Sequence, residues 1–286
     1  MRERIQRVIQ DIGGLTALDG ICDKAAGRVQ WVTRPTAVKN ALSGTWLGHP
    51  VHPALTDLPI GAWTTAFFLD LTAGRASASS ARRLVGLGLI AAVPTAASGA
   101  SDWSDTYGPT RRIGLVHALG NSAGTLLQAA SWVARRRGRH RLGMALSGVG
   151  LGFTVCTAYL GGHLSFALGN GVNHTAFQPT VSDWTDVADL SELGEGQLVR
   201  VTPGGVPVVL VQHEGTVFAL SATCVHAGGP LDEGKIVEDG CIQCPWHGST
   251  FRLADGRAVR GPAAVDEPSW EVKVTDGRVH VRSSTS

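Results

Sequence analysis

Long apolar blocks dominate the first two thirds of the chain. Four of them follow one another at about residues 54–73, 84–100, 113–134 and 142–162, and none contains Lys or Arg. Each holds roughly 17–22 residues, which is enough for a helix to cross the ~30 Å hydrocarbon core of a bilayer. The blocks are apolar or small-residue all round, whereas a helix on the surface of a soluble bundle needs a polar face. The pattern predicts four transmembrane helices, with the lipid bilayer as a partner.

The last hundred residues follow a different pattern, with short alternating segments bounded by Gly, Pro and Asp. Segments typical of β-strands lie at 197–202, 206–212, 216–221, 270–275 and 278–282. We therefore expect an α-helical membrane bundle of four transmembrane helices followed by a C-terminal all-β domain of antiparallel sheets.

Charge changes at the same place as the pattern. Residues 1–180 hold 17 Lys/Arg and 8 Asp/Glu, whereas residues 181–286 hold 8 and 15. A basic half beside a membrane and an acidic half in water fit this division, and no nucleic acid is expected as a partner. The predicted parts are an N-terminal segment at 1–45, the four-helix transmembrane domain at 46–175 and the β domain at 181–286.

Arginines gather in two of the loops between the apolar blocks. The first loop contains three of them at 75–83, and the third loop contains five at 135–141, whereas the middle loop has only Arg111 and Arg112. The positive-inside rule then places the two arginine-rich loops in the cytoplasm. The basic N-terminal segment would have to cross as well, so the balance only slightly favours a β domain outside the cytoplasm. We expect an integral protein of a bacterial plasma membrane.

Two short Cys/His segments lie in the β domain, Cys-Val-His at 224–226 and Cys-Pro-Trp-His at 244–247. One thiolate and one imidazole from each segment can hold a [2Fe–2S] cluster, with two Cys on one iron and two His on the other. The main alternative is zinc, because Cys241 and Cys244 also form a C-x-x-C pair. However, zinc fingers seldom use Cys-x-His, and five candidate ligands are one too many for a closed site. The predicted metal ligands are Cys224, His226, Cys244 and His247.

These segments and their flanks resemble Rieske proteins along residues 181–283. The resemblance rests on Cys-Val-His-Ala-Gly-Gly-Pro-Leu from 224, Cys-Pro-Trp-His-Gly-Ser-Thr-Phe from 244 and Arg-Gly-Pro-Ala from 260. It implies that the two cysteines bind a buried iron and the two histidines an outer one. Respiratory Rieske subunits have a disulfide between the two loops, at positions occupied here by Gly229 and Trp246. The chain therefore resembles the Rieske ferredoxins that serve aromatic-ring oxygenases.

The same resemblance suggests how the cluster is tuned. Ser249 keeps a hydroxyl where high-potential Rieske proteins place one against a cluster sulfur, whereas Phe251 replaces their tyrosine. Fewer hydrogen bonds to sulfur imply a lower reduction potential.

The membrane half resembles, more loosely, a family of bacterial four-span membrane domains of unknown function. The resemblance covers about residues 45–175 and opens with Gly-His-Pro-Val-His-Pro at 48–53. It implies no activity.

Several histidines fall on one side of the predicted bundle. A possible haem or quinone site there comprises His49, His52, Asp57, His117 and His163. Histidines and carboxylates at membrane depth are costly and mark functional candidates. Imidazole can ligate a b-type haem or accept a proton beside a quinone, most plausibly through His52 with His117 or His163. The alternative is that these are interfacial residues hydrogen-bonded to headgroups, water and loop carbonyls.

Three functions follow from these features. The first is an electron-transfer protein that exchanges one electron between a membrane partner, a quinone or haem, and another redox protein. The second is a ferredoxin tethered to the membrane that feeds a separate oxygenase or reductase. The third is a redox sensor whose cluster state alters the membrane domain. A stand-alone oxygenase would need a further His/His/carboxylate iron site, for which the chain has no room.

Overall fold

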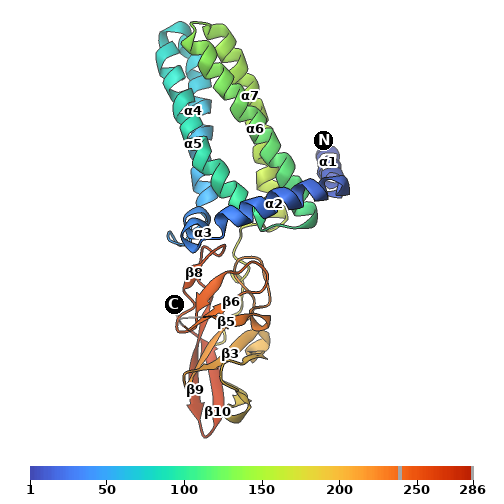
Figure 1. Cartoon of the computed structure of the whole chain (residues 1–286), viewed down its shortest axis with the longest axis vertical. Coiled ribbons are helices and arrows are strands. Elements are labelled where there is room, and N and C mark those ends of the chain that lie inside the picture. The colour runs from blue at the N-terminus through green and yellow to red at the C-terminus, as the bar shows by residue number, and fades with distance from the viewer. Residues whose placement is uncertain (238–239, 285–286) are drawn as a thin grey trace. The chain divides into compact units, whose positions relative to one another are not determined.

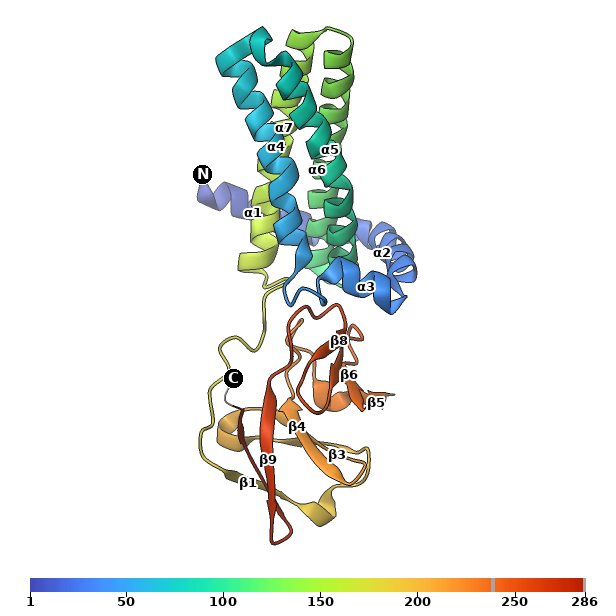
Figure 2. The ribbon, with the colours of Figure 1, turned by 90° about the vertical axis from the view of Figure 1, so that its left-hand side faces the viewer.

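The computed structural model describes residues 1–237 and 240–284, and the chain divides into two compact units. The first unit comprises Met1–Arg34 and Val51–Asn170, and the second comprises Pro35–Pro50 and the chain from Gly171 onward. The first is helical and the second is built of strands (Figures 1 and 2). A helical N-terminal region followed by an all-β domain of antiparallel sheets is therefore confirmed.

Four long helices form the first unit: α4 (Val51–Ala73), α5 (Ala78–Ser104), α6 (Gly108–Arg136) and α7 (His140–Gly162). Each contains one of the apolar blocks. α4 pairs with α5 and α6 pairs with α7, while α5 also packs on α6 and α4 on α7 (Figure 2). α4 and α6 are therefore diagonal neighbours, each flanked by α5 and α7.

Two helical stretches in the described residues are long and apolar enough to cross a membrane. One is Val51–Ser104, which contains α4, α5 and the turn between them, and the other is His140–Ala167, which contains α7. α6 does not meet the same criterion, because it has arginines at both ends and polar residues such as Asn121 and Gln128 between them. The structure confirms the helices, and the number of spans stays a prediction.

Two shorter helices, α1 (Arg2–Gly14) and α2 (Asp19–Thr33), belong to the same unit. Arg112 donates hydrogen bonds of 2.6 and 2.8 Å to the two carboxylate oxygens of Asp19, and Arg111 donates one of 2.7 Å to Asp23. These ion pairs tie α2 to the start of α6. They also neutralise the two arginines of the middle loop.

The third short helix, α3 (Thr36–Ser43), belongs to the second unit. Asn40 donates a 2.9 Å hydrogen bond to the carbonyl of Val259 and accepts one of 2.9 Å from the N–H of Gly261. Thr45 donates one of 2.8 Å to the carbonyl of Ala263. The N-terminal segment at 1–45 thus contributes to both units.

A six-stranded antiparallel sheet forms the base of the second unit, in the order β1-β10-β9-β4-β3-β2. Its strands are β1 (Thr185–Asp189), β2 (Leu198–Val201), β3 (Val208–His213), β4 (Thr216–Ser221), β9 (Ser269–Thr275) and β10 (Arg278–Ser283). Five of them lie at the segments predicted from alternation. β3 is buried on both faces, because successive side chains enter different core clusters: Val209 and Val211 enter one, and Val208 and Leu210 enter the other.

A second sheet of four very short strands is inserted between β4 and β9. These strands are β5 (Lys235–Val237), β6 (Cys241–Gln243), β7 (Thr250–Arg252) and β8 (Ala258–Arg260). Ile242 and Phe251 pack with Val209 and Leu220 in one core, which fixes this sheet on the larger one. The sequence analysis missed most of it, because three residues are too few to show alternation. Cys241 lies in β6, as expected for a strand residue.

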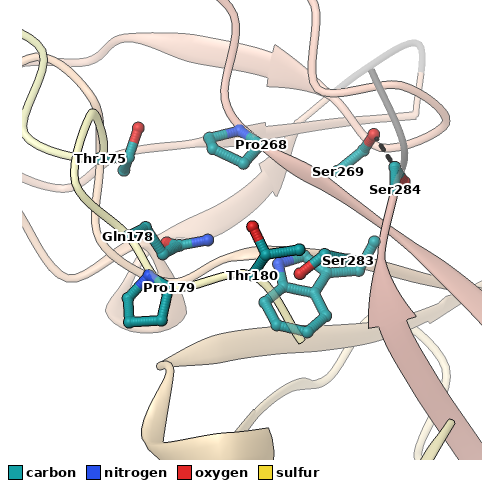
Figure 3. Close-up of a pocket in the computed structure, with 9 residues that line it drawn as sticks. Thr175, Gln178, Pro179, Thr180, Pro268, Ser269, Ser283 and Ser284 are labelled. Atoms are coloured by element: carbon teal, nitrogen blue, oxygen red, sulfur yellow. Dashed lines mark hydrogen bonds between the residues drawn. The ribbon is translucent and has the colours of Figure 1, made fainter. Parts of the chain in front are cut away.

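The segment that follows α7 covers one corner of the large sheet. It closes a pocket of about 160 Å³ whose lining includes Thr175, Trp270 and Ser283 (Figure 3). No residue of the predicted metal site lines this pocket.

Candidate metal centre

Two loops of the second unit, which we name the first ligand loop (224–229) and the second ligand loop (244–249), share one hydrogen-bonding design. In each, the N–H of the cysteine donates to the carbonyl five residues later, at 2.9 and 2.8 Å. The N–H four residues after the cysteine returns a bond to the cysteine carbonyl, at 2.8 and 3.1 Å. That fourth residue is Gly228 or Gly248, with φ of +74° and +73°, a conformation that favours glycine. The sequence therefore folds the same turn twice.

The two loops bring together all four predicted ligands. The thiols of Cys224 and Cys244 are buried and hydrogen-bonded to each other. The rings of His226 and His247 lie with centroids 4.9 Å apart and nearly perpendicular. Thiol is thus paired with thiol and imidazole with imidazole.

The protonation states of these side chains suit metal binding. Burial, then the charges of His247, Lys39 and His174, lower the pKa of His226 to about 3, so its imidazole is neutral at pH 7. The hydrogen bond from Cys224 lowers the pKa of Cys244 to about 7 and raises that of Cys224. Neutral imidazole and thiolate are the forms that bind metals.

An orphaned polar atom also points to a missing ligand. Nδ1 of His226 is buried and has no hydrogen-bond partner among the described residues. Burying such an atom without a partner costs about 1–3 kcal/mol, which a bound metal would offset. The residues present therefore fit an iron–sulfur cluster held by two thiolates and two imidazoles.

The contact between the loops leaves no room for a larger residue at position 229. A Cβ added to Gly229 would lie 3.0 Å from the ring of Trp246 and 3.1 Å from Sγ of Cys244. The loops touch directly at these two positions, where the resemblance excludes a disulfide.

Ser249 and Phe251 occupy the second ligand loop and the strand after it. Both are almost fully buried. Oγ of Ser249 accepts a 3.0 Å hydrogen bond from the N–H of Ala263, so its own hydrogen can be donated to another acceptor. The ring of Phe251 lies in β7 and offers no donor.

Three supporting residues were missed by the sequence analysis. Glu267 accepts a 2.9 Å hydrogen bond from the N–H of Val225, and Arg260 donates one of 2.9 Å to the carbonyl of Gly248. The N–H of His174 donates to the carbonyl of Val225 at 3.0 Å. All three are distant in sequence from the loops that they hold, and no spacing could have revealed them.

In the helical unit, the structure places two of the predicted histidines in comparable settings. Nδ1 of His52 lies 3.0 Å from the carbonyl of Thr95, and Nδ1 of His117 lies 2.8 Å from that of Thr157. A carbonyl only accepts, so Nδ1 carries the hydrogen in both rings.

The other three members of the predicted haem or quinone site lie in different settings. His49 is exposed in Pro35–Pro50, and Asp57 is exposed on α4, so this carboxylate does not face the bundle interior as expected. His163 is half-buried at the end of α7, where the π-helical turn His163–Ala167 begins.

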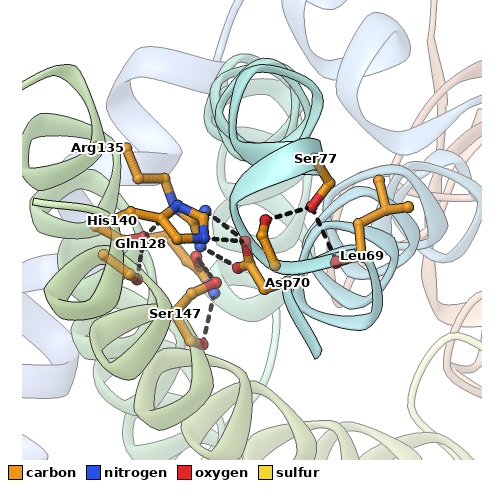
Figure 4. A network of polar contacts seen from close by, with 10 residues as sticks. Leu69, Asp70, Ser77, Gln128, Arg135, His140 and Ser147 are labelled. Carbon is orange, nitrogen blue, oxygen red and sulfur yellow. Dashed lines mark hydrogen bonds and ion pairs between the residues drawn. The ribbon is translucent and has the colours of Figure 1, made fainter. Parts of the chain in front are cut away.

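A buried ion pair that the sequence analysis did not anticipate lies at the opposite end of the bundle (Figure 4). Arg135 donates to both carboxylate oxygens of Asp70, and each side chain is almost fully buried. Nε of Arg135 also donates a 3.1 Å hydrogen bond to Ser131, and Nε2 of His140 lies 3.6 Å from Asp70. We had placed Arg135 in a loop, but α6 continues through Arg136, so this arginine lies inside the bundle.

Two families match the chain in separate regions. The Rieske [2Fe-2S] domain family matches residues 183–274, and the family described as "Predicted membrane protein (DUF2231)" matches residues 48–174.

Several curated relatives match about a third of this chain. A "Naphthalene 1,2-dioxygenase/salicylate 5-hydroxylase systems, ferredoxin component" of Ralstonia sp is 30% identical over 100 residues, which are 35% of this chain and 95% of that protein. An "Alkene monooxygenase system, ferredoxin component" of Xanthobacter autotrophicus is 34% identical over 34% of this chain and 79% of that protein. "Apoptosis-inducing factor 3" of Homo sapiens is 34% identical over 34% of this chain, but the chain spans only 16% of its length.

The geometry of the two ligand loops and the similarity to these relatives lead to the same conclusion. The chain belongs to the Rieske [2Fe–2S] family, and a domain of the DUF2231 predicted membrane protein family precedes its Rieske domain.

Proposed function

We propose that this protein is a membrane-anchored Rieske electron carrier. It passes one electron at a time between a membrane redox partner, a quinone or a haem, and another protein. The observation that carries this proposal is the pairing of thiol with thiol and imidazole with imidazole by two loops of one design. The chain acts as an electron carrier or oxidoreductase component rather than as a stand-alone enzyme.

In this proposal Cys224 and Cys244 hold the inner iron, and His226 and His247 hold the outer iron. The cysteines are 1% and 3% exposed, whereas the two histidines are half-buried, which supports this order from inside to outside. When bound, the cluster supplies a reversible one-electron carrier. The chain's own part is to keep the imidazole of His226 neutral and both rings partly exposed, where a partner can approach them.

Ser249 and Phe251 would set the reduction potential. The hydroxyl of Ser249 retains a hydrogen to donate, and the buried ring of Phe251 has none. One donor in place of two favours a potential lower than that of the respiratory Rieske proteins.

The helical unit anchors the protein through four membrane-spanning helices, α4 to α7. Each of them turns large apolar side chains outward, among them Phe68, Ile90, Leu126 and Val155, which are 62–71% exposed. The buried positions include several polar side chains, among them Asp70, Ser98, Gln128 and Thr157, beside small or apolar ones such as Ala66 and Val85. Large apolar side chains that face outward around an interior with polar groups suit a bilayer. α6 shares this arrangement, which supports its inclusion.

The plasma membrane of a bacterium is the proposed location, with the Rieske domain outside the cytoplasm. Arg111 and Arg112 at the start of α6 are neutralised by Asp23 and Asp19, whereas Arg75 in the turn after α4 and Arg83 at the start of α5 are exposed. This contrast favours a cytoplasmic location for the α4–α5 and α6–α7 turns. Reporter fusions at the C-terminus and at residues 137–139 test it, and an active cytoplasmic reporter at the C-terminus would reverse the orientation.

A second candidate function is a tethered ferredoxin that feeds a separate oxygenase or reductase. It is favoured by the relatives named as ferredoxin components of oxygenase systems, which the Rieske region matches along most of their length. In this case the membrane domain serves only as an anchor.

One experiment separates the two candidates. The full chain is purified in detergent, its cluster is verified by EPR after dithionite reduction, and a quinol analogue is then added to the oxidised protein. Reduction by the quinol without any added protein supports exchange with a membrane partner. A cluster that accepts electrons only from an added soluble reductase supports the tethered ferredoxin. A chain that incorporates no cluster when iron and sulfide are supplied would overturn both.

A further inference from the structure

The two helix hairpins of the bundle are copies of one unit. Residues 86–99 of α5 read GLGLIAAVPTAASG, and residues 148–161 of α7 read GVGLGFTVCTAYLG. The identical pairs are Gly86/Gly148, Gly88/Gly150, Leu89/Leu151, Val93/Val155, Thr95/Thr157, Ala96/Ala158 and Gly99/Gly161. In α4 and α6, Val-His at 51–52 corresponds to Val-His at 116–117. The shift is 65 residues for the first helix of each hairpin and 62 for the second.

Contacts inside the hairpins follow the same shifts. Trp63 donates a 3.3 Å hydrogen bond to the carbonyl of Val85, and the equivalent Gln128 donates one of 3.2 Å to the carbonyl of the equivalent Ser147. The His52–Thr95 and His117–Thr157 contacts are a second equivalent pair. The repeat is therefore structural and is not limited to composition.

Each histidine also packs against a glycine of the paired helix. A Cβ added at Gly99 would lie 2.6 Å from Cε1 of His52, and one added at Gly161 would lie 3.0 Å from Cε1 of His117. The two glycines are themselves equivalent. Both imidazoles are thus seated by the same two devices, a carbonyl that accepts from Nδ1 and a glycine that gives the ring room.

The repeats are related by an axis between the hairpins. Asp70 and Arg135 are equivalent positions, and they contact each other. A residue that contacts its own counterpart must lie beside the axis. His52 and His117 are 18 residues before these positions, about 27 Å along the helices at 1.5 Å per residue. They are also equivalent and lie on diagonal helices, and 18 residues are five full helical turns, so they fall on the same helix faces as Asp70 and Arg135 and face the same axis.

From this arrangement we propose that His52 and His117 are the two axial ligands of a b-type haem bound between the hairpins. This inference rests on the proposed function, because it names the membrane redox partner. With Nδ1–H held by a carbonyl, each imidazole presents the lone pair of Nε2, which is how metal-binding histidines are oriented. Facing positions in a helical bundle are a common place for such cofactors.

A haem suits this pair better than a bare metal ion. Two imidazoles cannot complete the tetrahedral shell that a zinc ion requires, whereas a porphyrin brings four in-plane nitrogens of its own. The Nε2 lone pairs accept hydrogen bonds and do not donate them, so they cannot bind the carbonyl oxygens of an oxidised quinone. A quinol could donate to them, and this is the competing outcome of the test.

Asn121 is the one described neighbour that must adjust. Its Nδ2 lies 3.2 Å from Nε2 of His117, and it also donates a 3.0 Å hydrogen bond to the carbonyl of the same residue. The bond to the carbonyl satisfies this amide when Nε2 turns to the iron.

The test uses the full chain, expressed with a haem precursor and purified in detergent. We expect a Soret band, a sharp α band on reduction and one haem per chain by pyridine haemochrome. His52→Gln and His117→Gln should each lose the low-spin spectrum. Glutamine can still donate to the carbonyl, as Gln128 does at its own position, but it does not ligate the iron. His163→Gln and His49→Gln are matched controls that should keep the spectrum.

The Rieske EPR signal of the same samples separates the two proposals. A cluster signal without any Soret band, or a full low-spin spectrum in both glutamine variants, would overturn the haem site and leave the electron carrier standing. If the chain contains no haem, and a quinol reduces its cluster in the wild type but not in the two glutamine variants, the pair is assigned to a quinol instead. A haem without a cluster signal would overturn the proposed function alone.

Discussion

Glu267 holds the first ligand loop through a 2.9 Å hydrogen bond from the N–H of Val225, the residue between Cys224 and His226. Its side chain is almost fully buried, and burial raises its pKa well above 4.5. The folded protein therefore holds this proton more tightly than the unfolded chain does.

This shift predicts a pH dependence of stability. Because the folded pKa is the higher one, the carboxyl destabilises the fold increasingly as pH rises above about 4.5 towards the folded pKa. Glu267→Gln keeps an acceptor for the N–H of Val225 and removes the cost of ionising a buried carboxyl. The melting temperature of this variant should therefore exceed that of the wild type, and by more at pH 8 than at pH 4.5. The exposed Glu192→Gln should show no such difference. Parallel pH profiles for Glu267→Gln and the wild type would contradict the prediction.

The reduction potential should depend on Ser249. Its hydroxyl accepts from Ala263 and has its own hydrogen left to donate to a cluster sulfur. Ser249→Ala removes this hydrogen bond and should therefore lower the reduction potential. Each 1.4 kcal/mol by which the reduced cluster is less stabilised lowers the potential by about 60 mV. Redox titration monitored by EPR measures this shift. Exposed Ser191→Ala provides the control, and an unchanged potential in Ser249→Ala would show that this hydroxyl does not reach the cluster.

Cys244 and Cys241 of the Rieske domain should respond differently to substitution by serine. Cys244→Ser should abolish the EPR signal of the reduced cluster, since Cys244 is paired with Cys224 in the ligand loops. Cys241→Ser should retain it, because Cys241 is a residue of β6, opposite Val237 and Arg252. Loss of the signal in Cys241→Ser with an intact fold would instead revive a site built on the C-x-x-C pair.

The Asp70–Arg135 pair should be costly to break from one side. Asp70→Asn leaves the buried guanidinium without a counter-charge, which costs about 3–5 kcal/mol. Thermal unfolding in detergent should therefore detect a large loss for this variant. The double variant Asp70→Leu/Arg135→Leu removes both charges and should recover most of the loss. A double variant as unstable as the single one would show that the pair contributes more than charge compensation.

Much of the fold could be predicted because its elements have strong local patterns. The apolar blocks became α4 to α7, and alternation located β3, β4, β9 and β10. The four side chains that meet in the ligand loops were predictable from spacing, since each loop carries its cysteine and histidine two or three residues apart.

The remaining features depend on contacts that no local pattern encodes. β5 to β8 have three residues each, and Glu267 reaches Val225 from 42 residues away. The Asp70–Arg135 ion pair could not be predicted, because Asp70 lies near the end of one apolar block and Arg135 follows the end of another, where the pattern indicates a loop. A comparison of the chain with itself would have revealed the repeat, which aligns Asp70 with Arg135 and His52 with His117.

The opposite charges at these equivalent positions also determine which hairpins can associate. Two copies of the first hairpin would bring Asp70 against Asp70, and two copies of the second would bring Arg135 against Arg135. Both pairings would bury like charges, and only a first hairpin with a second is neutral. The duplicated halves have thus become complementary, so that each finds its partner within the same chain and not in a neighbouring molecule.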